Sequence, residues 1–241
     1  MLDTLMFLQR VAPVRFEIVA VNVHHRQPGF PKHVLPDHLR RLGVPFRAVE
    51  QDTYSIVKKK IAPGKTTCSL CSRLRRGILY GTAKEIGATK IVLGHRCEDT
   101  LETLMLNMLF GGTMKTIPPK LRSDDGSNVV IRPLADCKEA DIKRDSNVMA
   151  FSSIPCDRCG SQPNLQRRAM KDLLQRWDKR YPQRLRSMLT AVTNIVPVHM
   201  MDRALFDFES FTDLSGKRSR GGTLFDVDST VADFQRSVEI D

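Results

Sequence analysis

The fold class is set by the segment Lys90-Ile-Val-Leu-Gly-His-Arg-Cys-Glu-Asp-Thr100, in which a short apolar run gives way to the start of a helix. The β-branched and apolar residues before Gly94 are typical of a buried parallel strand. Over residues 99–110 the apolar side chains return at helical spacing, and Gly111-Gly112 gives a stop. We therefore predict a strand that leads into a helix. The loop between them would lie at the carboxyl edge of the sheet, where doubly wound folds bind ligands.

Similar runs on either side of this segment extend the pattern. We expect further strands at residues 16–23, 46–50 and 129–132, and further helices at residues 35–42 and 70–86. Strands that alternate with helices indicate an α/β fold, with a parallel sheet and crossover helices.

The pattern changes after Pro133. Residues 165–177 and 183–195 predict two amphipathic, strongly basic helices, and residues 212–222 are polar and contain glycine. We therefore expect three parts: an α/β domain over residues 1–133, a basic helical region over residues 134–211, and a flexible tail over residues 212–241.

The composition is that of a basic globular protein. A chain of 241 residues with 41% hydrophobic residues can bury a sizeable core, and its formal net charge is +11. Nucleic acid is the commonest partner for such an excess; a merely basic surface, or binding of small acidic metabolites, is the alternative. We expect no membrane span, no secretory leader and a cytoplasmic location, where structural disulfides are uncommon. Cys97 and Cys137 stand alone and are expected to be packed thiols.

Two Cys-x-x-Cys pairs are the strongest chemical signal. They are Cys68-Ser-Leu-Cys71 and Cys156-Asp-Arg-Cys159. Thiolates at this spacing can hold one soft metal centre, and two pairs could close a single site around zinc or an iron–sulfur cluster. Spacing does not separate these metals, and it does not decide whether three or all four cysteines bind.

The loop after the strand at residues 90–94 has two interpretations. In the first, Asp99 and Thr100 cap the following helix, with Glu98 complementing its dipole. In the second, His95 and Asp99 face a nucleotide and its magnesium ion. No catalytic residue is assigned from the pattern.

Arginines accompany both cysteine pairs. Arg73, Arg75 and Arg76 lie on the same expected helix as the first pair, and Arg167 and Arg168 follow the second. Charge runs are often only a solvated face, but a phosphate backbone beside the metal site would explain these residues.

Several longer segments resemble the tRNA 2-thiocytidine biosynthesis (TtcA) family of the PP-loop ATPase superfamily. The fullest match is Cys-Ser-Leu-Cys-Ser-Arg-Leu-Arg-Arg-Gly-Ile-Leu-Tyr at residues 68–80. The others are residues 27–31, 118–120, 123–126, 159–166, 177–182 and 205–208. The resemblance runs from about residue 12 to residue 208.

The resemblance implies an adenine nucleotide alpha hydrolase-like (PP-loop) fold and a tRNA sulfurtransferase. Members of the family use ATP and Mg²⁺ to adenylate the C2 oxygen of cytidine 32, and sulfur at a [4Fe-4S] cluster then replaces that oxygen. Carried over by position, the cluster ligands would be Cys68, Cys71 and Cys159, with Cys156 as the alternative. The arginines beside the cysteines and the basic helical region would then contact tRNA.

The resemblance also suggests partners. These are tRNA and a cysteine desulfurase or another persulfide donor, with no membrane; a homodimer is left open.

The chain departs from the family pattern in two places. The ATP loop Ser-Gly-Gly-x-Asp-Ser is absent, and residues 1–10 resemble the helix that follows it. We therefore expect the central first strand to be missing, which leaves the strands at residues 16–23 and 90–94 without a partner between them; a misassigned start or an incomplete sequence would explain this. Residues 95–99 differ from the usual His-His-Arg-Asp-Asp, and residues 145–149 also differ.

Two alternatives stand beside this interpretation, one from the missing loop and one from the cysteine pairs. The first is a truncated, non-catalytic protein that binds metal and tRNA without ATP turnover. The second is a zinc-binding basic protein unrelated to sulfur chemistry.

Overall fold

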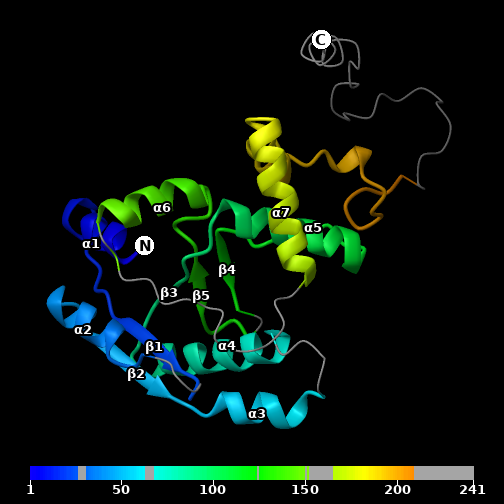
Figure 1. The fold of residues 1–241 in the computed structure, drawn as a ribbon. Coiled ribbons are helices and arrows are strands. Elements are labelled where there is room, and N and C mark those ends of the chain that lie inside the picture. Colours follow the sequence, from blue (N-terminus) through cyan, green and yellow to red (C-terminus); the bar gives the residue numbers. More distant parts are fainter. Residues whose placement is uncertain (27–30, 63–67, 124, 150, 152–164, 209–241) are drawn as a thin grey trace. The chain divides into compact units, whose positions relative to one another are not determined.

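The computed structural model describes residues 1–26, 31–62, 68–123, 125–149, 151 and 165–208 (Figure 1). The chain divides into two compact units, Met1–Thr190 and Ala191–Asp241. The first unit carries the described strands, and the described part of the second includes the 3₁₀ helix η2 (Pro197–His199). The boundaries predicted at residues 133 and 211 remain predictions.

The first sheet is a parallel strand pair. β1 (Ala20–His24) pairs along its whole length with β2 (Phe46–Glu50), and α2 (Val34–Arg41) lies between them in the chain. Gly43 follows α2 with a φ of +66°, a conformation that glycine adopts without strain. This strand–helix–strand unit confirms the predicted parallel pairing, although β1 begins at Ala20 because β2 offers no partner before Phe46.

The second sheet has the order β3-β5-β4. β3 (Ile91–Val92) runs parallel to β5 (Val129–Ile131), and β4 (Lys120–Arg122) runs antiparallel to β5. The described residues therefore form two sheets, one with an antiparallel edge, where the sequence predicted one parallel sheet. The β4–β5 connection is too short to join parallel strands, which need a crossover of about a dozen residues or more. Within the described part of the chain, β1 and β3 each have a strand neighbour on one side only.

Helices make up most of the described chain. The remaining ones are α1 (Leu2–Val11), α3 (Thr53–Lys60), α4 (Cys68–Glu85), α5 (Cys97–Gly111), α6 (Glu139–Val148), α7 (Leu165–Arg180) and α8 (Arg184–Thr193). Helices α4, α5, α7 and α8 confirm the predicted ones with ends shifted by a few residues. Helices α3 and α6 were not predicted from the sequence. No helix within the described ranges is long and apolar enough to cross a bilayer.

The buried core joins α5 to α7 and α8. Cys97, Leu101, Leu174 and Leu185 are each at most 3% exposed and form one cluster. Figure 1 shows α7 lying across α5. Burial raises the pKa of the Cys97 thiol to about 11, so this residue is the packed thiol that the sequence predicts.

Candidate functional site

The first cysteine pair lies at the start of α4. Cys68 is the first residue of the helix, and Cys71 lies one turn further along and is half-buried. Residues three apart share a helix face, so the spacing suits two ligands of one centre. The side chain of Cys68 is not described, and Cys156 and Cys159 lie outside the described residues. The predicted ligand set therefore stays a prediction, and within the described ranges no three His, Cys, Asp or Glu side chains gather as a metal site.

The arginines that follow on α4 are exposed. Arg73, Arg75 and Arg76 have no acidic partner among the described residues, unlike Arg47, which pairs with Glu85 at 2.8 Å. Such a group of cations, without carboxylates to neutralise it, favours an anionic ligand.

Three polar side chains follow the carboxyl ends of parallel strands. His25 follows β1, His95 follows β3 and Arg132 follows β5. Arg132 Nε donates to His95 Nδ1 at 3.3 Å, and its Nη1 donates to the Pro118 carbonyl at 2.6 Å. A guanidinium can only donate, so His95 is neutral at Nδ1 and carries its hydrogen on Nε2.

Electrostatics link these residues to α4. Burial, followed by the charge of Arg132, lowers the pKa of His95 below its ordinary value, and Arg75 adds to the effect. Burial and then Arg75 likewise lower the pKa of His25, whose Nδ1 lies 2.5 Å from Thr53 Oγ1. The charge of Arg75 thus acts on both rings, and α4 packs against β1 in the fold. Of the predicted arginines, Arg75 and Arg167 are those whose charges act on His95.

Neither His25 nor Arg132 was assigned a role from the sequence. Each stands directly after an apolar strand, the same position that singled out His95. Position at a strand's carboxyl end was therefore the signal that could have found both.

Asp99 closes a capping box at the start of α5. Its Oδ2 accepts the backbone N–H of Arg96, the N-cap residue, at 2.9 Å and the Arg96 Nε at 3.3 Å. The helix-capping interpretation is therefore confirmed for Asp99. Thr100 bonds back to the Arg96 carbonyl instead, and both oxygens of Glu98 accept the Glu139 backbone N–H at 2.9 Å. A nucleotide or magnesium role for His95 and Asp99 remains a prediction.

Glu139 holds three cations where α5, α6 and α7 meet. Its carboxylate lies 3.1 Å from Arg96, 2.9 Å from Lys171 and 3.0 Å from Lys143. Burial alone would raise the pKa of Glu139, but hydrogen bonds from the two lysines and the charge of Arg96 hold it at about 2. Glu139 therefore stays ionised at neutral pH and ties the three helices together.

The two predicted tRNA-contacting arginines of α7 differ in their surroundings. Both arginines are exposed, but Arg167 Nη1 pairs at 3.1 Å with Glu102, whose side chain is 6% exposed, and Arg168 has no acidic partner among the described residues. Burial raises the pKa of Glu102, and the charge of Arg167 opposes that shift. The guanidinium of Arg167 therefore pairs with a buried carboxylate of the protein, so its charge is only partly available to an external anion.

A solved structure shares this fold. The chain superposes on the U34-tRNA thiolase NcsA from Methanococcus maripaludis with its [4Fe-4S] cluster. The TM-score is 0.62 at 16% identity, over 100% of this chain and 77% of that one. The fold is therefore an α/β fold similar to that of this tRNA thiolase.

Sequence comparison narrows this class to one family. The chain is 58% identical to the tRNA-cytidine(32) 2-sulfurtransferase of Idiomarina loihiensis, over 98% of this chain and 78% of that protein. It is 61% identical to the enzyme of the same name from Chromohalobacter salexigens, over 88% of this chain and 75% of the relative. No protein-family model matches the chain. The chain belongs to the tRNA-cytidine(32) 2-sulfurtransferase family, a family of transferases, which confirms the resemblance drawn from its motifs.

Proposed function

We propose that this chain converts cytidine 32 of tRNA to 2-thiocytidine, with ATP and Mg²⁺ adenylating the C2 oxygen and sulfur transferred at a [4Fe-4S] cluster. Relatives that are 58–61% identical to this chain are named tRNA-cytidine(32) 2-sulfurtransferase, which supports this reaction. Adenylation is the chemically sensible first step, because a carbonyl oxygen is a poor leaving group and AMP is a good one.

The observation that carries the proposal is the composition of α4. Two cysteines one turn apart are followed, within the next turns, by Arg73, Arg75 and Arg76, which have no acidic partner in the described part of the chain. Cysteines at this spacing suit an iron–sulfur cluster, and exposed arginines suit the phosphates of RNA. A surface of this kind would place a tRNA loop beside a metal-bound thiolate site.

The residues present fit a cluster chemically. Cys71 lies half-buried in the first turn of a long helix, where the helix dipole and the nearby arginines favour negative charge. We propose Cys68, Cys71 and Cys159 as ligands, with Cys156 as the alternative third ligand. When bound, the cluster would supply the place where sulfur is held and transferred.

On the nucleotide side we propose His95 and Asp99. Both lie at the carboxyl edge of the strands, where ligands of this fold class bind. The Nε2–H of His95 would donate to a phosphate oxygen, and Arg75, close enough to lower the pKa of His95, would add positive charge. Asp99 would hold Mg²⁺ while it continues to cap α5.

The sheets suggest how the fold is completed. We propose that a further strand, of the kind that the family resemblance places at the sheet centre, pairs with the open edges of β1 and β3. We also propose that a cysteine desulfurase or another persulfide donor supplies the sulfur, and that the reaction takes place in the cytoplasm.

The test is a reconstituted thiolation assay. The chain, purified without oxygen, would be analysed for iron and acid-labile sulfide and then incubated with unmodified tRNA, ATP, Mg²⁺ and a sulfide source. We expect 2-thiocytidine at position 32 by nucleoside mass spectrometry, its loss in Cys71→Ser, and wild-type product in the matched control Cys137→Ser. Absence of 2-thiocytidine from cluster-loaded chain that binds tRNA would overturn the proposal.

A second candidate is a non-catalytic metal- and tRNA-binding protein, because the cysteines and arginines of α4 would suit a metal and RNA whether or not ATP is consumed. This candidate predicts tRNA binding and metal content without ATP consumption, so the same assay separates the two functions.

A further inference from the structure

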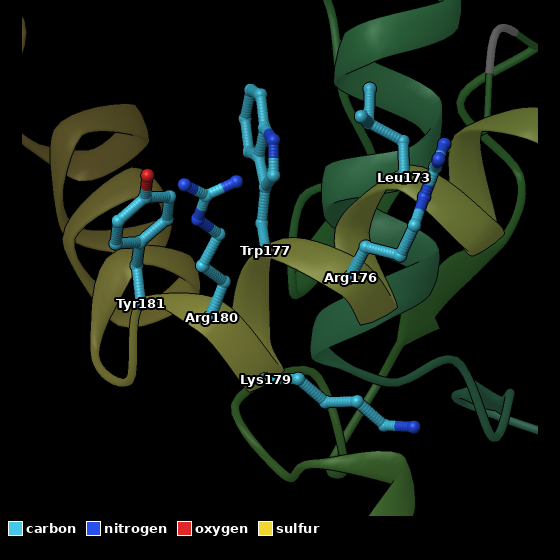
Figure 2. Close-up of a pocket in the computed structure, with 6 residues that line it drawn as sticks. All are labelled: Leu173, Arg176, Trp177, Lys179, Arg180 and Tyr181. Carbon is cyan, nitrogen blue, oxygen red and sulfur yellow. The ribbon is translucent and has the colours of Figure 1, made fainter.

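The last turns of α7 carry an exposed hollow that neither the cluster nor the nucleotide side uses. Its volume is about 620 Å³, within the range of roughly 300–1,000 Å³ that is usual for ligand pockets. The residues that line it are Leu173, Arg176, Trp177, Lys179, Arg180 and Tyr181. Figure 2 shows the side chains of Trp177 and Arg180 on α7 and that of Tyr181, just beyond the end of α7, pointing to the same side.

The aromatic rings of this hollow are not part of the core. Trp177 is 37% exposed and Tyr181 is 44% exposed, whereas Leu174, on the neighbouring face of α7, is 1% exposed. Leu173 and Trp177 stand four residues apart and so share one face of α7, and Tyr181 follows directly after the helix ends at Arg180. Leu174 docks the helix, and the aromatic face remains available to another molecule.

The Tyr181 ring is held between two arginines before any ligand arrives. The Arg180 and Arg184 guanidinium carbons each lie 5.4 Å from the centre of the Tyr181 ring. The backbone N–H of Tyr181 donates to the Trp177 carbonyl at 2.8 Å, and that of Arg184 donates to the Tyr181 carbonyl at 3.2 Å. A preorganised surface loses little conformational entropy on binding.

The charge of the hollow selects its occupant. Three of the six lining side chains are cationic and none is acidic, and the adjacent Asp178 is engaged by Lys138 at 3.5 Å. Aromatic faces bordered by arginine and lysine suit a nucleobase and its flanking phosphates better than an apolar peptide.

We propose that Trp177, Arg180 and Tyr181 form a stacking platform for an unpaired nucleobase of the tRNA substrate. Arg176 and Lys179, which line the same hollow, contact phosphates of the bound strand. The inference rests on the proposed function, because it takes RNA as the bound polymer, and it adds a second contact site remote from α4 in the chain.

The test uses the fluorescence of Trp177, the chain's one tryptophan. Titration of the full chain with unmodified tRNA quenches this fluorescence, with the same midpoint as tRNA retention in a filter-binding assay. Loss of the ring in Trp177→Ala weakens tRNA binding about 10-fold, since stacking on one aromatic side chain is worth about one to two decades of affinity. Trp177→Phe keeps a ring and stays within about threefold of wild type.

Two further variants separate stacking from charge and from general surface effects. Arg180→Gln weakens binding and lowers the salt dependence of binding, whereas Arg180→Lys keeps the salt dependence. Val148→Ala changes neither, because Val148 is 79% exposed on α6, away from α7 in the chain. Tyr181→Ala repeats the test if Trp177→Ala folds poorly.

The outcomes distinguish this inference from the proposed function. Unchanged Trp177 fluorescence, or wild-type binding by both alanine variants, while tRNA is bound and thiolated, overturns the platform alone. A fluorescence change that follows protein concentration without RNA means that a second copy covers the face, and it also overturns the platform. If the wild-type chain binds no tRNA, the proposed function fails together with it.

Discussion

Two charged regions of this protein use their charges in opposite ways. Where α5, α6 and α7 meet, the cations are paired with carboxylates of the protein. Glu139 binds three cations, and Glu102 binds Arg167. On α4 the exposed Arg73, Arg75 and Arg76 have no acidic partner among the described residues. The first region therefore serves stability, and the second is arranged for an anion that the protein itself does not provide.

The largest expected effect is at Glu139. Glu139→Ala should lower the free energy of unfolding by about 3 kcal/mol, because Arg96 and Lys171 lose their shared partner in a nearly buried position. Urea denaturation measures this loss. In the matched control Glu85→Gln, an exposed pair with Arg47 is broken, and the change should stay below about 1 kcal/mol.

The contribution of Glu139 should also depend on pH. Its pKa is lowered from 4.5 to about 2 in the folded protein, so its contribution is fully present above about pH 4.5 and is lost as the pH falls toward 2. The gap between wild type and Glu139→Gln should therefore be smaller at pH 3 than at pH 7. An equal gap at both values would show that the ion pairs do not stabilise the fold.

Substitution of the neighbouring residues Arg167 and Arg168 should affect stability to different extents. Arg167→Ala should cost about 2 kcal/mol of stability, because the carboxylate of Glu102 is left buried without its partner. Arg168→Ala should change stability by less than about 0.5 kcal/mol. Thermal melts compare the two variants directly. Equal stability would show that the pair of Arg167 with Glu102 does not stabilise the fold.

The α4 arginines should affect binding rather than folding. Replacing Arg73, Arg75 and Arg76 together by glutamine should weaken tRNA binding at least about 10-fold and reduce the slope of log affinity against log salt by about two. Unfolding should change by less than about 1 kcal/mol. Arg144→Gln is the control, because Arg144 is exposed but paired with Asp141 at 2.9 Å. An unchanged salt slope in the triple variant would show that tRNA does not bind to this surface.

The smallest expected effect is at Asp99. Asp99→Ala should cost about 1 kcal/mol through the lost cap of α5, and Asp99→Asn, which still accepts the Arg96 N–H, should cost less. Urea denaturation of both variants checks this order. If Asp99→Asn keeps its stability but loses Mg²⁺-dependent ATP turnover, the residue has both predicted roles; unchanged turnover would leave it as a cap only.

Apolar periodicity predicted those helices whose buried faces are apolar. The α4, α5 and α7 segments show it, and Leu101 and Leu174 in α5 and α7 are buried as expected. Helix α6 was missed because its one buried residue is Glu139, which looks like a surface residue until Lys171 and Arg96 are brought to it by the fold. The antiparallel β4 was missed because all of its residues are exposed and no alternation marks it.

Position along a strand led to one residue of the candidate site. The rule that ligands lie beyond the carboxyl ends of strands found His95, and applied further it would have found Arg132, its hydrogen-bond partner. The difference between Arg167, which pairs with Glu102, and Arg168 could not be predicted, because Glu102 lies far away in the sequence.

The composition of the core also determines how long part of it stays exposed while the protein is synthesised. Leu101 is completely buried, yet two of its cluster partners, Leu174 and Leu185, leave the ribosome only some 70 to 85 residues later. At translation rates of about 5–20 residues per second, the apolar face of α5 waits for roughly 4 to 17 seconds without those partners. During that interval the nascent chain exposes an aggregation-prone surface, so any premature stop before α8 should yield insoluble fragments rather than a smaller folded domain.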